Sequence, residues 1–483
     1  MREKPSLIIE LPDGFTDVVS WICALESFVE RYRHVASFNS RDLFTLNFWD
    51  DVISKDWSSS IEDIWHEIDD LDEWMELWSR IASNDSSSDD IKWLTDDLKS
   101  FVDQCRSLGL KQQMSHRNTD LTYRSQNMHI MRGIDRKKVH EIECITQYIK
   151  QILSEYNGIS GVLDVGCGVG SLSLTLASEI IKLKKHVNVH GIDGKEIHIE
   201  TARRRLDVLQ KKESTENESI SDVEFTNNFI EGAEDLNNLM IDKGLKYLIC
   251  SLHACGNLSP YMLQCFIDSP DVEAIVNVGC CYQLLDEEIT CNKDCAKNNR
   301  MRFPLSKFVN IQLGERLRTL AVQASQKWPS MASMKLMFHK HVYRAVLQHS
   351  LVKYGICEAK NLDRTHTTGK LKSRYFRNGF VPYALEAQER LNYERKLSAN
   401  QLQESWEELK PFIYQVIAQV SLRAMCAPAV ESLILADRAC FLHHELNLKW
   451  ESGGINGGRV ALVEMFDTKI SPRNWAVVGL KYK

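Results

Sequence analysis

The sequence predicts an α/β protein in which a seven-stranded, mostly parallel sheet follows a helical domain and is interrupted by a helical insertion. An apolar run at 162–165 leads through alternating glycines into a helical pattern, as in a buried strand that turns tightly into a helix. Four further apolar runs, at 187–193, 223–230, 247–252 and 274–279, alternate with helical patterns, as a parallel sheet requires. The runs 459–466 and 475–480 are joined by the turn Ser471 to Asn474 and predict a closing hairpin.

The composition is that of a soluble globular protein. The chain has 483 residues, 43% of them hydrophobic and 26% charged, which is typical of about two to three domains. No apolar run is long enough to span a membrane, and Met1–Glu10 lacks the apolar segment of a signal peptide. The fourteen cysteines are therefore expected to be reduced thiols, in the cytoplasm or the nucleus.

The N-terminal region predicts an acidic helical domain. Residues 1–100 hold nine Lys/Arg and 23 Asp/Glu, a net charge of −14, which leaves +7 for residues 101–483. Apolar side chains at helical spacing predict helices over 18–35, over 61–81 and from about residue 91. Seven of the eleven tryptophans precede residue 100. A bundle with a solvated acidic exterior is favoured over an aromatic docking surface for a protein partner, and the mildly basic remainder permits RNA.

These patterns divide the chain into four predicted regions. We expect an acidic helical domain over 1–112 and a core with the first five strands over 113–312. A helical insertion with the last core helix follows over 313–450, and the closing strands lie within 451–483.

The glycine-rich turn predicts a site for a nucleotide-type cofactor. Gly166, Gly168 and Gly170 allow left-handed backbone angles and close ligand approach, and the next helix points its N–H groups at the ligand. Asp193 ends the second strand, where an acid would accept both ribose hydroxyls. Dinucleotide sites prefer Gly-x-Gly-x-x-Gly, but Ser171 occupies the last glycine position. A nicotinamide cofactor remains the alternative on the residues alone.

The tighter pattern Asp-x-Gly-x-Gly-x-Gly at 164–170 resembles motif I of class I, Rossmann-like methyltransferases. This resemblance implies that S-adenosylmethionine is the cofactor, with Asp164 near its methionine ammonium and the three glycines beneath it. Seven strands with a final hairpin suit the methyltransferase sheet, whereas a six-stranded dinucleotide fold would not use the last strand.

The strand ends supply the remaining candidate residues, because the carboxyl ends of parallel strands meet at one edge of the sheet. After the fourth strand, Ser251 is expected to contact the cofactor and His253 to accept a proton, with packing against the cofactor as the alternative role of His253. The candidate substrate contacts are Cys280, Cys281 and Tyr282 after the fifth strand, Lys138 and His140 before the first, and Lys370 and Lys372 in the basic segment 353–377.

The cysteine spacing argues against a metal site. Cys280, Cys281, Cys291 and Cys295 lie close together in the sequence, which suggests zinc. Adjacent cysteines fit tetrahedral ligation poorly, however, and two Cys-x-x-Cys arms are missing. We therefore expect no metal, and thiols that pack beside the cofactor.

Several longer motifs resemble the methyltransferase-like protein 25 family, a relative of which is named ribosomal RNA adenine dimethylase domain-containing protein. They lie at 251–256, 279–282, 303–306, 343–345 and 466–474, and the resemblance covers roughly 115–483. It implies an S-adenosylmethionine-dependent methyltransferase. One position departs from the family, because Asn257 stands where Asp is usual; restoring the acid is expected to be tolerated or mildly activating.

The residues after the fourth strand argue against adenine N6 methylation, since no Asn/Asp-Pro-Pro-aromatic sequence occurs there. His-x-Cys-Gly at 253–256 is more similar to tRNA 2′-O-methyltransferases, which points to an RNA hydroxyl. The alternatives are a protein methyltransferase and a scaffold that binds the cofactor without transferring its methyl group.

Overall fold

The computed structural model describes residues 2–83, 88–111, 130, 133–213, 223–240, 244–287, 301–323, 331–358, 371, 374–391 and 393–482. The chain forms two compact units, and we call them the sheet unit and the helical unit. The sheet unit comprises Met1–Glu26, Leu110–Val322 and Glu431–Lys483. The helical unit comprises Ser27–Gly109 and Gln323–Val430.

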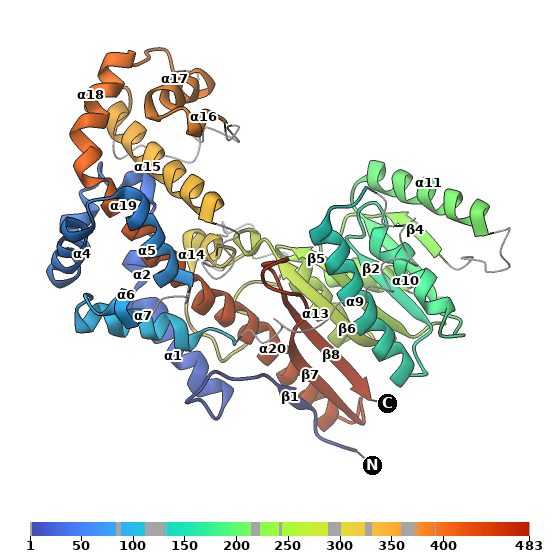
Figure 1. The fold of residues 1–483 in the computed structure, drawn as a ribbon. Coiled ribbons are helices and arrows are strands. Elements are labelled where there is room, and N and C mark those ends of the chain that lie inside the picture. Colours follow the sequence, from blue (N-terminus) through green and yellow to red (C-terminus); the bar gives the residue numbers. More distant parts are fainter. Residues whose placement is uncertain are drawn as a thin grey trace. The chain divides into compact units, whose positions relative to one another are not determined.

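The sheet unit contains one eight-stranded sheet, ordered β1-β7-β8-β6-β5-β2-β3-β4 (Figure 1). The seven predicted strands are all present, and β8 is antiparallel to both of its neighbours, which confirms the predicted hairpin. They are β2 (Gly161–Val165), β3 (Asn188–Asp193), β4 (Val223–Asn227), β5 (Tyr247–Cys255), β6 (Val272–Cys280), β7 (Gly457–Glu464) and β8 (Trp475–Tyr482). The predicted class I, Rossmann-like sheet is thus confirmed.

One strand, β1 (Ser6–Ile8), was not predicted. It pairs in parallel with β7, with Ser6 opposite Arg459 and Ile8 opposite Ala461. Three residues are too few to show the alternation by which a strand is recognised in a sequence.

Helices cover the sheet and bury its central strands on both faces (Figure 1). All five residues of β2 are buried, which explains its continuous apolar run, because strands covered on both faces do not alternate with polar residues. The helices of this unit are α9 (Arg136–Glu155), α10 (Ser171–Ile181), α11 (Glu196–Glu213), α12 (Ala233–Met240), α13 (Leu258–Asp268), α14 (Gly314–Leu320) and most of α20 (Ala427–Glu451).

The helical unit packs the early helices against those of the insertion. Trp74 Nε1 donates to the Tyr414 carbonyl at 3.1 Å, and Trp65 stacks on Tyr414 with ring centroids 5.3 Å apart. Residues 27–109 therefore bury their apolar faces against 323–430. The division into regions 1–112, 113–312, 313–450 and 451–483 stays a prediction. The helices of this unit are the end of α1 (Val18–Arg31), α2 (Arg33–Ala36), α3 (Phe48–Asp51), α4 (Lys55–Ile68), α5 (Leu71–Ser83), α6 (Ser88–Ile91), α7 (Asp96–Leu108), α15 (Met331–Lys353), α16 (Arg374–Arg377), α17 (Phe380–Leu391), α18 (Ala399–Leu409) and α19 (Ile413–Met425).

The single helix predicted over 61–81 is wrong, because the chain breaks between α4 and α5. Asp69 adopts a left-handed backbone with φ of 43°, and the Asp70 carboxylate accepts the backbone N–H of Glu73 at 2.9 Å. Asp69 ends α4 and Asp70 caps α5, so the helix is interrupted even though the apolar spacing continues across the break.

The early tryptophans lie mostly in the interior. Trp21, Trp49, Trp57, Trp74 and Trp78 are buried, whereas Trp93 is 52% exposed. Their burial supports the bundle interpretation, and a partner on the acidic exterior stays a prediction. None of the helices among the described residues is both long and apolar enough to cross a membrane.

Candidate active site

The glycine turn between β2 and α10 has the predicted backbone. Gly166, Gly168 and Gly170 have φ values of 75°, 57° and 73°. A Cβ at Gly170 would lie 2.7 Å from the Phe225 ring, so this glycine permits packing, whereas a Cβ at Gly168 would meet no atom within 4 Å. Gly166 and Gly168 line a pocket at the strand ends, and Gly170 does not.

Asp193, at the end of β3, fixes this turn. Its Oδ2 accepts the Gly168 N–H at 3.0 Å, while Oδ1 accepts the Lys195 N–H at 2.9 Å and is 3.0 Å from His198 Nδ1. A carboxylate has about four lone-pair positions, so these contacts leave about one for a ligand hydroxyl.

The pocket beside Asp193 has a volume of about 770 Å³. Its wall combines the glycine turn with the ends of β3, β4 and β5. Phe229, which follows β4, is 69% exposed and lines the pocket, so it offers an apolar face next to the Asp193 carboxylate. An open glycine cradle, an available carboxylate lone pair and an exposed aromatic ring together fit a nucleoside-containing ligand.

His253 lines the same pocket and is oriented by Glu141. His253 Nε2 lies 3.3 Å from Glu141 Oε2, and the Ser471 hydroxyl donates to Glu141 Oε1 at 2.6 Å. Burial would raise the pKa of Glu141, but the hydrogen bonds from His253 and Ser471 outweigh it and leave this pKa below its ordinary value. A carboxylate bound to Nε2 favours the tautomer with its proton there, and Nδ1 is buried without a partner among the described residues. Nδ1 is therefore left as a proton acceptor.

Asn257 and Asp286 form a reciprocal contact in the pocket wall. Asn257 Nδ2 donates to Asp286 Oδ2 at 2.6 Å, and Asn257 Oδ1 accepts the Asp286 backbone N–H at 3.0 Å. An aspartate at position 257 would place two carboxylates together, so this geometry argues against the expectation that restoring the family's acid is tolerated.

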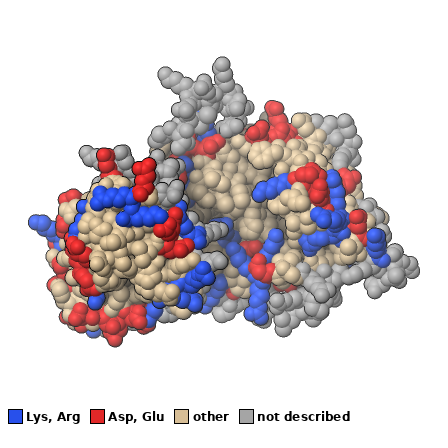
Figure 2. Space-filling model, turned by 90° about the horizontal axis from the view of Figure 1, so that it is seen from above, with Lys and Arg blue, Asp and Glu red and all other residues tan. Residues whose placement is uncertain are grey.

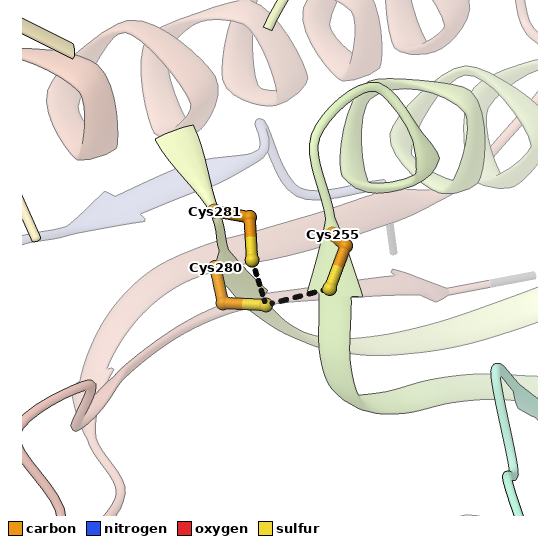
Figure 3. A group of neighbouring side chains, drawn as sticks. All are labelled: Cys255, Cys280 and Cys281. Atoms are coloured by element: carbon orange, nitrogen blue, oxygen red, sulfur yellow. Dashed lines mark hydrogen bonds between the residues drawn. The ribbon is translucent and has the colours of Figure 1, made fainter. Parts of the chain in front are cut away.

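Three thiols meet where β5 and β6 end (Figure 3). Cys255 Sγ lies 3.1 Å from Cys280 Sγ, which lies 3.7 Å from Cys281 Sγ. The contact with Cys280 lowers the pKa of Cys255 to about 6 against the opposing effect of burial. Of the three, only Cys255 lines the pocket.

Several predicted site residues face the protein interior instead. Asp164 is 1% exposed and its Oδ2 accepts the Ser173 hydroxyl at 2.6 Å; burial raises its pKa to about 6. Ser251 is fully buried with no hydrogen-bond partner for its hydroxyl among the described residues. His140 Nε2 accepts the Asp467 N–H at 3.0 Å, which ties α9 to the end of β7, and burial lowers the pKa of His140.

The other predicted substrate contacts that the structure describes also lie outside the pocket wall. Cys280 and Tyr282 are each 1% exposed, and Cys281 is half-buried. Lys138 is half-exposed in the first turn of α9 and acts to lower the pKa of Asp164. Lys370 and Lys372 lie outside the described residues.

The structure adds Glu141, Phe229 and Asp286 to the site. Glu141 directly follows His140 in the segment before the first predicted strand, and Phe229 lies within the apolar run predicted as a strand over 223–230. Glu141 and Phe229 thus lay in segments that the sequence already singled out, but nothing in the sequence connected Glu141 to His253. Asp286 had no sequence signal.

The comparisons with known proteins agree with this geometry. Residues 137–288 match a family model described as a methyltransferase domain, and this segment contains β2 to β6, Glu141 and His253. The "Probable methyltransferase-like protein 25" of Mus musculus is 32% identical over 240 residues, covering 48% of this chain and 37% of that protein. Its Homo sapiens counterpart is 31% identical with the same coverage.

The resemblance based on the sequence motifs is thus confirmed, while the match spans little more than a third of the length of these relatives. Among solved structures, magnesium protoporphyrin IX methyltransferase from Synechocystis PCC 6803 with bound SAH is 15% identical. The match covers 33% of this chain and 67% of that chain, with a TM-score of 0.20.

Proposed function

We propose that this protein is an S-adenosylmethionine-dependent methyltransferase whose acceptor is a hydroxyl group of RNA. The observation that carries the proposal is the Glu141–His253 pair at the wall of the pocket formed by the glycine turn and Asp193. A methyl acceptor that loses a proton during transfer needs a positioned base, and this pocket contains one next to a nucleoside-type site.

The residues suited to hold the cofactor are Asp193, Phe229 and the turn at Gly166 and Gly168. Asp193 has lone-pair capacity for a ribose hydroxyl, and Phe229 offers its ring to an adenine. The glycines leave room for a ligand to approach the backbone. The bound cofactor would supply an activated methyl group.

His253, whose ring lines the pocket, would take the acceptor's proton. Glu141 holds Nε2, sets the tautomer and stabilises the positive charge that forms on the ring. Because Glu141 is itself fixed by Ser471, the ring is oriented from a buried anchor.

RNA is supported by the charge of +7 over residues 101–483 and by the seven cations of the segment 353–377, which include Lys370 and Lys372. One of the seven, Lys353, has its Nζ paired with Glu404 at 3.1 Å and Glu408 at 2.6 Å. On the face in Figure 2, Lys and Arg side chains are interspersed with Asp and Glu over much of the surface. A phosphate site in the segment predicts that RNA affinity falls steeply with salt, and that charge reversal at Lys370 and Lys372 lowers the salt slope by about two.

The decisive experiment is transfer of labelled methyl groups to a fractionated cell extract, followed by RNase or protease. We expect label that RNase removes and that is lost with His253→Ala. Label removed only by protease would indicate a protein methyltransferase, and cofactor binding without any label would indicate a scaffold. The proposal locates the protein in the cytoplasm or nucleus, where thiols stay reduced, and none of the twelve described cysteines forms a disulfide.

A further inference from the structure

The ends of β5 and β6 bring Cys255 next to the adjacent pair Cys280 and Cys281, although 25 positions separate Cys255 from Cys280 in the sequence. Cys255 and Cys280 are partners in the parallel register of the two strands, after a register shift between Ser251 and Ala254. Their Sγ atoms are 3.1 Å apart, and all three Sγ atoms lie within 4.8 Å of one another (Figure 3). Cys291 and Cys295, which the sequence spacing also suggested as zinc ligands, lie outside the described residues.

The backbone at Cys281 removes the objection to adjacent cysteines. Successive residues of a strand point to opposite faces of a sheet, so Cys280 and Cys281 would normally diverge. Cys281 instead has φ of 52° and ψ of 48°, a left-handed conformation that residues with a Cβ rarely adopt. This turn places its Sγ 3.7 Å from that of Cys280.

We propose that Cys255, Cys280 and Cys281 form a three-thiolate site for one thiophilic metal ion, with Zn²⁺ as the biological occupant. With metal–sulfur bonds of about 2.3 Å, sulfurs on one face of a tetrahedron are about 3.8 Å apart. The Cys280–Cys281 separation of 3.7 Å matches this value, and Cys255 Sγ would move by less than an ångström from its 3.1 Å separation to Cys280 Sγ. Three protein ligands leave a fourth position, as in zinc sites that bind water or a substrate group. Binding replaces the thiol protons with three sulfur–metal bonds and releases up to three protons to solvent.

A buried cation next to the cluster matches the charge of such a site. Arg438 is 1% exposed, and its Nη1 and Nη2 have no hydrogen-bond partner among the described residues. Its guanidinium stacks over Tyr282 at 5.2 Å and occupies the space that a Cβ at Gly279 would need. Gly279 and Tyr282 flank the two adjacent cysteines. Three thiolates and one divalent ion carry a net charge of −1, which the guanidinium would balance.

The site adjoins the candidate active site through Cys255, which lines the same pocket as His253. The metal proposal is independent of the methyltransferase proposal, because metal content and thiol protection are measured without substrate.

The test uses the full chain, purified without chelators, and elemental analysis by mass spectrometry. We expect about one zinc per chain, and loss of it in the triple variant Cys255→Ser, Cys280→Ser, Cys281→Ser. Cys23→Ser is the matched control, because Cys23 is an exposed free cysteine outside the cluster, and it should retain the ion. In competition with a chromophoric chelator, each single cluster variant should weaken Zn²⁺ binding by at least about 100-fold.

A second measurement does not depend on the folding of any variant. The metal-free wild-type protein is alkylated with and without Zn²⁺, and labelling at each cysteine is read by peptide mass spectrometry. Zn²⁺ should slow labelling of Cys255 by at least about tenfold and leave Cys23 unchanged. Equal labelling rates, metal retained by the triple variant, or a Cys255–Cys280 disulfide in freshly purified protein would each overturn the proposal.

Discussion

Replacing Asn257 with aspartate, the residue that the related family carries there, would bring two carboxylates into contact. Asn257 Nδ2 donates to Asp286 Oδ2 at 2.6 Å, and Oδ1 accepts the Asp286 backbone N–H at 3.0 Å. The variant can still accept the Asp286 backbone N–H, but its hydrogen bond to Asp286 Oδ2 is replaced by repulsion between two carboxylates. The pocket wall should therefore open more easily.

The magnitude follows from the geometry. Two like charges about 4 Å apart repel by about 4 kcal/mol at an effective dielectric constant of about 20. Both side chains are only half-buried, so solvent and side-chain rotation reduce this penalty. We expect a net loss of about 1–2 kcal/mol in the local free energy of opening.

Hydrogen exchange and calorimetry measure the two consequences. The amides of 256–258 and 284–287 should exchange about 5–30-fold faster in Asn257→Asp, and S-adenosylhomocysteine should bind about 3–10-fold more weakly. The matched control is the double variant Asn257→Asp, Asp286→Asn, in which amide and carboxylate exchange places. It should recover at least about 1 kcal/mol relative to the sum of the single variants. Wild-type exchange in Asn257→Asp, or additive effects in the double variant, would refute the reasoning.

Three further predictions concern the cofactor site, the base and the buried acid. Asp193→Ala removes the acceptor for Gly168 and for a ligand hydroxyl, so S-adenosylhomocysteine affinity should fall by about 2 kcal/mol in calorimetry; equal affinity would show that Asp193 does not bind the cofactor. Glu141→Gln removes the charge that orients His253, so kcat for methyl transfer should fall by about 10²–10⁴ with cofactor affinity nearly unchanged, whereas a matching loss of affinity would indicate a structural role. Asp164 has a pKa raised by burial from 3.8 to about 6, so the folded state binds its proton more tightly than the unfolded state does. The stability contributed by this proton is present below pH 3.8 and is lost as the pH rises through about 6. When the pH is lowered from about 7.5 to about 5, the melting temperature of the wild type should therefore rise relative to that of Asp164→Asn. A difference that stays constant over this range would contradict the assignment.

Seven of the eight strands could be predicted from the sequence, because the central strands are buried on both faces and appear as continuous apolar runs. The same reasoning located the glycine turn, Asp193 and His253, since a strand end determines which residues reach the pocket edge. It could not reveal that Asp164 and Ser251, which we predicted to contact the cofactor, are buried and do not line the pocket. Asp164 turns toward Ser173 of α10, and side-chain direction at a strand end depends on packing that a single sequence does not contain.

The Glu141–His253 pair could not be predicted from the sequence, because its two residues come from elements that are far apart in the chain. Glu141 lies on α9 and His253 on β5, and Ser471, in the turn before β8, fixes the carboxylate between them. The three residues meet only after the hairpin β7–β8 has joined the sheet. Asn257 and Asp286 are likewise joined by the spatial proximity of two loops, which no periodicity records.

The position of β8 has a consequence for synthesis of the chain on the ribosome. Ala274–Asn277 of β6 pair with residues 477–480, so this edge of the sheet stays open until the final strand emerges. About 195 residues separate the end of β6 from the start of β8, and they include the second half of the helical unit. At about 5–20 residues per second, the nascent chain carries an unpaired apolar strand for roughly 10–40 s. Unpaired strand edges invite association with other chains, so folding of this protein should depend on chaperones that cover β6 during that interval.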